Sequence, residues 1–159
     1  MNELATTSAA IRSFYTFRLG PRLGGIELPH VREISPHLPT TPVPQVPPAV
    51  RGLTNLRSRI YLVLDLQPLL ESSPTECTSD SRLIILKPDV ALDVAVLVES
   101  GADIVHVRSE QIEPVSNSSD VQADSASSMM ITGVCKLDRE LLMVVDPKML
   151  IDAVTKLLR

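Results

Sequence analysis

One stretch near the middle of the chain decides the fold. It reads Val50-Arg51-Gly52-Leu53-Thr54-Asn55-Leu56-Arg57-Ser58-Arg59 and continues as Ile60-Tyr61-Leu62-Val63-Leu64-Asp65-Leu66. The second run is about seven residues long and consists mainly of Ile, Val, Leu and Tyr, which is typical of a β-strand. Gln67–Leu70 predicts a short helical turn after this strand, and Glu71–Asp80, rich in Ser, Thr and Pro, predicts a loop.

Short strands bounded by turn residues recur on both sides of this stretch. They are predicted at Ser13–Leu19, Gly24–Leu28, Ser81–Leu86, Leu92–Val98, Ile104–Val107, Ile131–Lys136 and Glu140–Val145. Pro29 predicts a short helical turn that ends in Val31–Ile34, and Asp146-Pro147 predicts the start of a C-terminal helix over Lys148–Arg159. This pattern predicts an all-β barrel or sandwich with one terminal helix.

A proline-rich segment precedes the central stretch. Six of the 13 prolines lie in Pro36–Pro48, which excludes a helix and disfavours a central strand. Such a segment is either a free polyproline II ligand for another domain or a stiff crossover packed on its own domain. Val43 and Val46 interleave with the prolines and favour the packed crossover.

Composition and charge narrow the class of partner. Of the 159 residues only 3% are aromatic, and the formal net charge is −4. Both facts argue against a nucleic-acid partner, because single strands are bound by aromatic stacking and all nucleic acids by basic surfaces. The longest apolar runs, Leu83–Leu86 and Val94–Val98, are far shorter than the roughly 18 to 20 residues that span a bilayer, so no membrane insertion is expected.

The chain start and the cysteines predict a cytoplasmic protein. Residues 1–12 are expected to form a flexible tail, and no secretory signal is visible in them. Cys77 and Cys135 are too few for a disulfide framework or a cysteine zinc site. One disulfide between them and two unpaired thiols are both compatible with the sequence, and the unpaired thiols are favoured.

No constellation of residues predicts catalysis, a cofactor or a metal site. His30, His37 and His106 lack ligand-like spacing, and neither a Gly-x-Ser-x-Gly elbow nor a Gly-rich phosphate loop is present. Cys135 lies in a predicted strand, where a small core side chain is a better interpretation than a nucleophile. A small ligand-binding or enzymatic β-barrel remains an alternative, which a deep polar pocket at His106 or Cys135 would favour.

The order of short motifs along the chain resembles the CheW family of bacterial chemotaxis adaptors. The motifs are Gly25-Ile26, Val31-Arg32-Glu33-Ile34, the proline-rich segment, Val50–Arg57, Leu64-Asp65-Leu66, Val96–Glu99 and the hairpin from Gly133 to Asp146. Gly-x-x-Asn-Leu-Arg, at residues 52–57, is the most specific part. The resemblance implies two side-by-side five-stranded SH3-like barrels with a C-terminal helix, intertwined within one domain over residues 13–159.

The function implied by the resemblance is that of a non-catalytic adaptor without cofactors. It would couple transmembrane chemoreceptors to a CheA-type histidine kinase, in cytoplasmic arrays at the inner membrane. The expected partners are the kinase, the cytoplasmic tips of methyl-accepting chemoreceptors, and other copies of the adaptor in rings. A diverged adaptor of a pilus-motility or other chemosensory-like pathway is the alternative within this class.

Position within the resemblance predicts two contact faces. The receptor-binding residues are Val31, Glu33, Arg57 and Leu83, and the kinase-binding residues are Ile34, Thr41, Val50 and Gly52. Asn55 and Asp65 are predicted to cap turns, and Gly52 to permit a close backbone approach. Arg57 has a second interpretation, in which its planar guanidinium ties a turn by bonding carbonyls or a carboxylate.

The sequence departs from the family pattern at Gly24, Ser58, Gly101 and Arg139. The family often has an aromatic residue at the position of Gly24 and an apolar residue near that of Gly101. It usually has glycine at the positions of Ser58 and Arg139. A left-handed backbone at Ser58 or Arg139 would cost on the order of 1 kcal/mol, which the fold should survive. The departures therefore bear on affinity and partner choice, because Gly101 and Ser58 lie near surfaces that the family uses.

Overall fold

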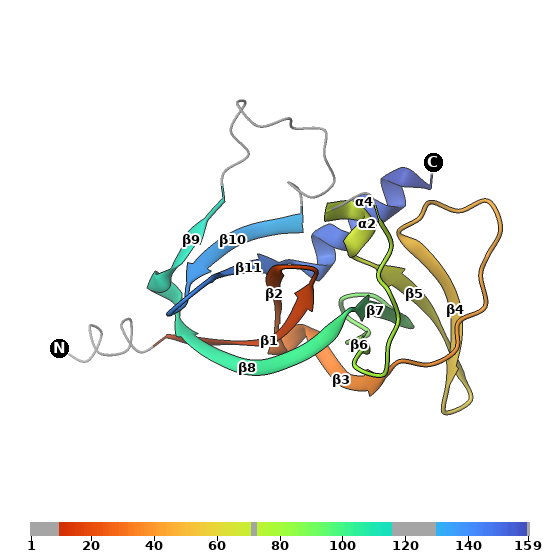
Figure 1. The fold of residues 1–159 in the computed structure, drawn as a ribbon, viewed down its shortest axis with the longest axis horizontal. Coiled ribbons are helices and arrows are strands. Elements are labelled where there is room, and N and C mark those ends of the chain that lie inside the picture. The colour runs from red at the N-terminus through yellow and green to blue at the C-terminus, as the bar shows by residue number, and fades with distance from the viewer. Residues whose placement is uncertain (1–9, 71–72, 116–129, 159) are drawn as a thin grey trace.

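Two β-sheets form the body of the protein in the computed structural model, which describes residues 10–70, 73–115 and 130–158 (Figure 1). The first sheet has the order β8-β1-β2-β11-β10-β9, with β1 Ile11–Leu19, β2 Arg22–Glu27, β8 Ser100–Arg108, β9 Ile112–Pro114, β10 Ile131–Lys136 and β11 Leu141–Val145. The second has the order β3-β6-β7-β5-β4, with β3 Val31–Pro36, β4 Val50–Leu56, β5 Arg59–Asp65, β6 Arg82–Leu86 and β7 Val94–Val98. The helical segments are η1 Leu28–His30, α2 Gln67–Leu70, η2 Ser109–Gln111 and α4 Pro147–Leu157.

The predicted fold class, all-β with a C-terminal helix, is confirmed, and the strands form two sheets. The first sheet exceeds the expected five strands by β9, a three-residue strand that pairs with β10. Each sheet contains one parallel pair, β2 with β11 and β5 with β7, and these pairs join strands that are distant in the sequence. The β2–β11 pair thereby places an early strand and the last strand of the chain side by side in the first sheet.

Apolar side chains are buried in three clusters, a central one to which both sheets contribute and one formed by each sheet alone. Strand β7 illustrates the division, since Val94, Val96 and Val98 join the central cluster whereas Ala95 and Leu97 join the cluster of the second sheet. Successive side chains of a strand point to opposite faces, so both faces of β7 are covered. Helix α4 adds Leu150 and Val154 to the central cluster.

Several element boundaries differ from the sequence prediction, and two of the differences concern β3 and β1. The helical turn at Pro29 ends at His30, and Val31–Ile34 lies in β3 instead. The reason is tertiary, because this segment pairs with β6 and its apolar side chains pack against the central cluster. Strand β1 begins at Ile11, so that the last two residues of the expected tail pair with β8, whereas residues 1–9 lie outside the described residues.

The proline-rich segment is packed on its own domain, as the interleaved valines predict. Thr41 and Leu53 exchange two backbone hydrogen bonds, of 2.7 and 2.9 Å, and the Thr54 hydroxyl donates to the carbonyl of Pro39 at 2.8 Å. Val46 packs against the central cluster. The segment therefore covers part of the outer edge of β4 and protects an edge strand from unwanted pairing.

The C-terminal helix begins where Asp146-Pro147 predicts. The Asp146 carboxylate accepts a hydrogen bond from the backbone N–H of Lys148 at 2.9 Å, and Pro147 occupies the first turn. Such a cap satisfies one of the backbone donors that a helix leaves unpaired at its start. No helix of the described part of the chain has the length and apolar character needed to span a membrane.

Candidate docking surface

The hairpin of β4 and β5 ends in a two-residue turn, Arg57-Ser58. Their φ angles are 53° and 67°, and two consecutive left-handed residues are typical of a type I′ turn. The side-chain oxygen of Asn55 accepts a hydrogen bond from the Ser58 backbone N–H at 3.0 Å, which confirms Asn55 as the cap of this turn. Ser58 therefore stands where glycine would be unstrained, whereas Arg139 is not left-handed.

The turn holds the Arg57 guanidinium against the Glu33 carboxylate on β3. Two nitrogens of Arg57 each lie 2.7 Å from one oxygen of Glu33, which is the bidentate geometry of a charge-assisted pair. Strands β3 and β4 are the two edges of the second sheet, so this pair joins its first and last strands. The hydrogen bond from Arg57 lowers the pKa of Glu33, and the bond from Glu33 raises the pKa of Arg57.

A solvent-open hollow of about 360 Å³ adjoins the Glu33–Arg57 pair. Its lining consists of Arg32, Leu56, Arg57, Ser58, Arg59 and Tyr61. Arg59 makes a second ion pair at the same end of the hairpin, with Nε 2.7 Å from a carboxylate oxygen of Asp93. The lining is mainly polar and charged, and its apolar members are Leu56, which is partly buried, and Tyr61, which is buried.

The four predicted receptor contacts differ in their access to solvent. Arg57 is mostly exposed, and Glu33 and Val31 are partly exposed. Leu83 is fully buried, so the prediction that its side chain contacts a partner is wrong. Strand β6 is paired on both sides, by β3 and β7, and Leu83 lies within the apolar cluster of the second sheet. The sequence pattern placed Leu83 on a strand but did not show which face of that strand is covered by the rest of the protein.

The four predicted kinase contacts also divide into exposed and buried residues. Thr41 is exposed, and Ile34 is half-buried against the central cluster. Val50 and Gly52 are buried, so neither offers a side-chain surface to a partner. Gly52 has φ 143°, and a Cβ there would overlap the carbonyl of Thr41, which confirms the predicted close backbone approach. Both buried residues therefore serve the packing of the crossover on β4.

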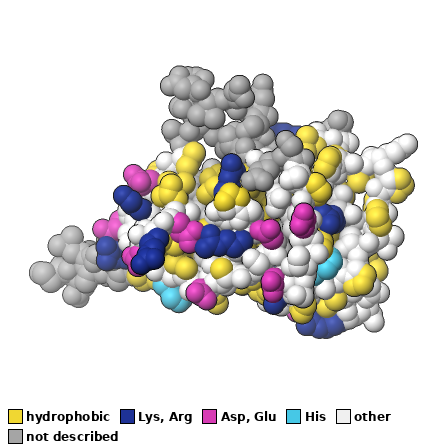
Figure 2. All heavy atoms as spheres, viewed as in Figure 1, with side chains coloured by type: hydrophobic (Ala, Val, Ile, Leu, Met, Phe, Trp, Pro, Cys, Tyr) yellow, Lys and Arg dark blue, Asp and Glu magenta, His cyan; other side chains and the backbone are white. Residues whose placement is uncertain are grey.

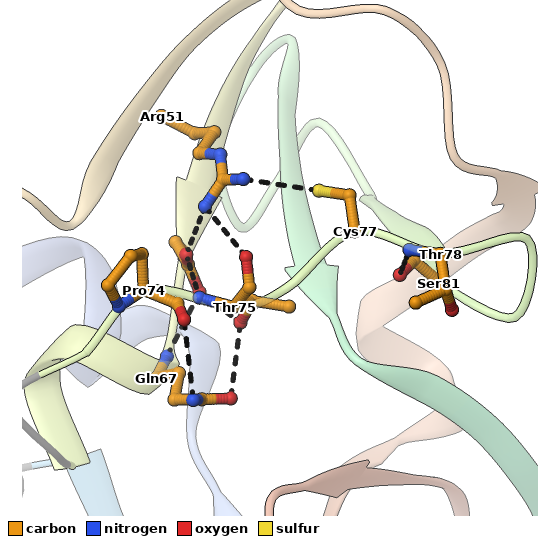
Figure 3. A network of polar contacts seen from close by, with 8 residues as sticks. Arg51, Gln67, Pro74, Thr75, Cys77, Thr78 and Ser81 are labelled. Carbon is orange, nitrogen blue, oxygen red and sulfur yellow. Dashed lines mark hydrogen bonds and ion pairs between the residues drawn. The ribbon is translucent and has the colours of Figure 1, made fainter.

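A buried ionic network lies at the opposite end of the same hairpin (Figure 3). The fully buried Asp65 carboxylate accepts hydrogen bonds from the backbone N–H of Gln67 at 3.1 Å, which confirms its predicted capping role. It also accepts from the Thr75 backbone and hydroxyl, at 2.9 and 2.6 Å, and from Arg51 at 3.0 Å. All of its lone-pair directions are thereby used.

Sequence reasoning missed the wider part of this network. Arg51 is the extra residue of a β-bulge between Val50 and Gly52, and bulges redirect side chains. From there its guanidinium also donates to the Thr75 carbonyl at 3.0 Å, tying the loop after α2 to the hairpin (Figure 3). The available signal was Asp65 at the end of the apolar run Ile60–Leu64, with Arg51 at the start of the preceding strand, because a buried charge needs a partner.

The departures at Gly24 and Gly101 are both explained by the aromatic residues of β1. Gly24 and Gly101 pair with Phe17 from its two sides, in β2 and β8. A Cβ on Gly24 would lie 2.8 Å from the Phe17 ring, and a Cβ on Gly101 would overlap the hydroxyl of Tyr15. The rings of Phe17 and Tyr15 therefore occupy the space that side chains at positions 24 and 101 would need.

The cysteines and His106 have structural surroundings. Cys77 is exposed and Cys135 is buried, and neither forms a disulfide. Burial raises the pKa of the Cys135 thiol, which agrees with its interpretation as a core residue. His106 is exposed, with Nδ1 2.6 Å from the Ser13 hydroxyl. Among the described residues no group of three or more His, Cys, Asp or Glu side chains is arranged to hold a metal ion.

Comparisons with known proteins extend these observations. Residues 13–155 match the model of a family described as the CheW-like domain. The probable chemotaxis protein CheW of Rhizobium etli is 27% identical over 136 residues, covering 85% of this chain and 84% of that protein. The chemotaxis protein CheW of Bacillus subtilis is 30% identical over 127 residues, covering 80% and 78%. The crystal structure of the scaffolding protein TtCheW from Thermoanaerobacter tengcongensis matches 84% of this chain and 83% of its own, with TM-score 0.69 and 22% identity, and shares its fold.

Proposed function

The chain belongs to the CheW-like domain family of chemotaxis adaptors, and we propose that it couples transmembrane chemoreceptors to a CheA-type histidine kinase. The single observation that supports this most strongly is the Glu33–Arg57 pair. Two residues assigned to the receptor face from separate motifs meet at 2.7 Å, and the Arg57 side chain remains largely exposed. Val31, partly exposed on the same strand as Glu33, completes the proposed receptor face.

The proposed kinase face comprises Thr41 and Ile34, the two accessible members of the predicted set. Thr41 is held by its paired hydrogen bonds to Leu53, so the exposed crossover backbone is rigid at this point. A rigid two-sheet body with separate faces for two partners needs only modest contacts at each, because repeated units in an array add avidity. We place the protein in cytoplasmic arrays at the inner membrane, where other adaptor copies complete rings.

The receptor face is tested by reversing a charge in the Glu33–Arg57 pair. Glu33→Lys should weaken binding of a receptor cytoplasmic fragment and leave binding of the kinase regulatory domain unchanged. The matched control is Glu140→Lys, which breaks a similar bidentate pair with Arg18, of 2.7 and 2.9 Å, in the first sheet. Equal receptor binding by the two variants would show that the proposed face is misplaced.

The adaptor role itself is tested by pull-down of the cognate kinase with the folded wild-type chain. Capture at concentrations on the order of tens of micromolar is expected for a contact that avidity reinforces. Failure to capture the kinase at that concentration would contradict the proposed coupling.

A further inference from the structure

The hollow beside the hairpin turn carries a further inference, which rests on the function proposed above. We propose that this hollow recognises an acidic segment of the receptor tip, and that Arg32 and Arg59 determine this preference. The hollow brings together three arginines, Arg32, Arg57 and Arg59, in a chain whose net charge is −4. Figure 2 shows acidic and basic side chains interspersed over the face that it views.

Both ion pairs at this site present their positive member to solvent. Side-chain exposure is 70% for Arg57 against 24% for Glu33, and 53% for Arg59 against 34% for Asp93. In each pair the carboxylate is the less exposed partner and the guanidinium group is the more exposed one. The surface that a binding partner would contact is therefore positive. Arg32 is exposed and makes no ion pair with any described carboxylate, so its charge adds to this surface.

A β-bulge brings Arg32 to the hollow. Val31 pairs with Leu86 and Glu33 with Ile85, which leaves Arg32 as the extra residue of β3. In a regular strand the side chains of Arg32 and Glu33 would point to opposite faces. Here Glu33 binds Arg57, and Arg32 lines the same hollow as Arg57, because the bulge redirects its side chain. The backbone irregularity therefore concentrates positive charge at one place.

The chemistry of the hollow fits a carboxylate-bearing helix or loop. Guanidinium forks bind carboxylates with two parallel hydrogen bonds, and Leu56 and Tyr61 supply an apolar floor for the stems of neighbouring side chains. A protein segment is favoured over a small anion because the hollow is open and adjoins the proposed receptor face at Glu33 and Arg57. Charge complementarity of this kind sets partner choice and association rate more than it sets total affinity.

The test compares Arg32→Gln/Arg59→Gln with Arg22→Gln/Arg139→Gln, which removes the same charge from exposed positions on β2 and in the β10–β11 loop. The probe is a receptor hairpin-tip fragment from the source organism, with its acidic residues intact or changed to Gln and Asn. The hollow variant should bind the intact fragment about tenfold more weakly than the control, with a flatter salt dependence. It should bind the neutralised fragment as the control does, and Arg32→Lys/Arg59→Lys should recover part of the loss.

The possible outcomes separate the inference from the proposed function. Receptor binding that is equally salt-dependent in the hollow variant and the control would overturn the inference and leave the adaptor role standing. A wild-type chain that captures neither receptor fragment nor kinase would overturn both. Urea unfolding of each variant, followed by circular dichroism, checks that the fold is retained.

Discussion

The two ends of the β4–β5 hairpin each hold an arginine bonded to a carboxylate, and they differ in burial. At the base, Asp65 is fully buried and Arg51 reaches it at 3.0 Å from a bulge. At the turn, Glu33 keeps some exposure and Arg57 keeps most of its exposure. A buried pair becomes indispensable once formed, because either partner left alone is an uncompensated charge, whereas an exposed pair adds little stability. The base therefore holds the fold, and the turn is free to serve binding.

The largest expected effect on stability is at the base of the hairpin, and it is tested by changing the carboxylate at each end of the hairpin to an amide. Asp65→Asn should lower the free energy of unfolding by about 3–5 kcal/mol, because an amide nitrogen would face the donors of Arg51 or Thr75. Glu33→Gln should leave the urea midpoint close to wild type, since water replaces the lost contact. Circular dichroism is the suitable probe because the chain has no Trp. A similar loss of unfolding free energy in the two variants would contradict the conclusion that the base stabilises the fold and the turn does not.

A smaller loss is expected at Gly52, beside Arg51 in the base. Gly52→Ala should lower the free energy of unfolding by about 1–3 kcal/mol, because φ 143° is strained for any side chain and the added Cβ would overlap the Thr41 carbonyl. Urea denaturation measures the loss. An unchanged midpoint would mean that the crossover is not packed on β4 as described.

A substitution in the Arg57-Ser58 turn is expected to stabilise the fold instead of destabilising it. Ser58→Gly should raise the free energy of unfolding by about 1 kcal/mol, because glycine adopts φ 67° without the Cβ penalty. Ser58→Val should lower it, since a branched side chain tolerates this conformation least. A Ser58→Gly variant that is less stable than wild type would argue that the turn is not left-handed.

The smallest effect concerns pH and His37, which lies near Arg51. Burial, and then the charge of Arg51, lower the pKa of His37 from its ordinary value of 6.5. The unfolded chain therefore takes up the proton first, so the free energy of unfolding should fall as pH drops below 6.5 toward the lowered pKa. His37→Gln should reduce this dependence. Identical pH profiles for wild type and His37→Gln would refute the effect.

The candidate site was only partly predictable from the sequence. Asn55 and Asp65 were correctly predicted as caps because a capping side chain acts on backbone two or three residues away. Leu83 and Val50 were misassigned as contacts because strand periodicity tells which residues share a face and not whether that face is covered. Arg32 and Arg59 were missed because a bulge and a distant turn bring them beside Arg57.

By itself the sequence determined most of the strands, the stiff crossover, the terminal helix and the family resemblance, because these depend on local conformational preferences and motif order. Tertiary structure alone decided which carboxylate meets which arginine. Glu33 lies on the edge strand β3 and Arg57 in the turn that follows the other edge strand, β4, and only the packed fold brings them within 2.7 Å. The packed fold also buries Leu83 and leaves Thr41 exposed, so access to partners is a property of the tertiary structure.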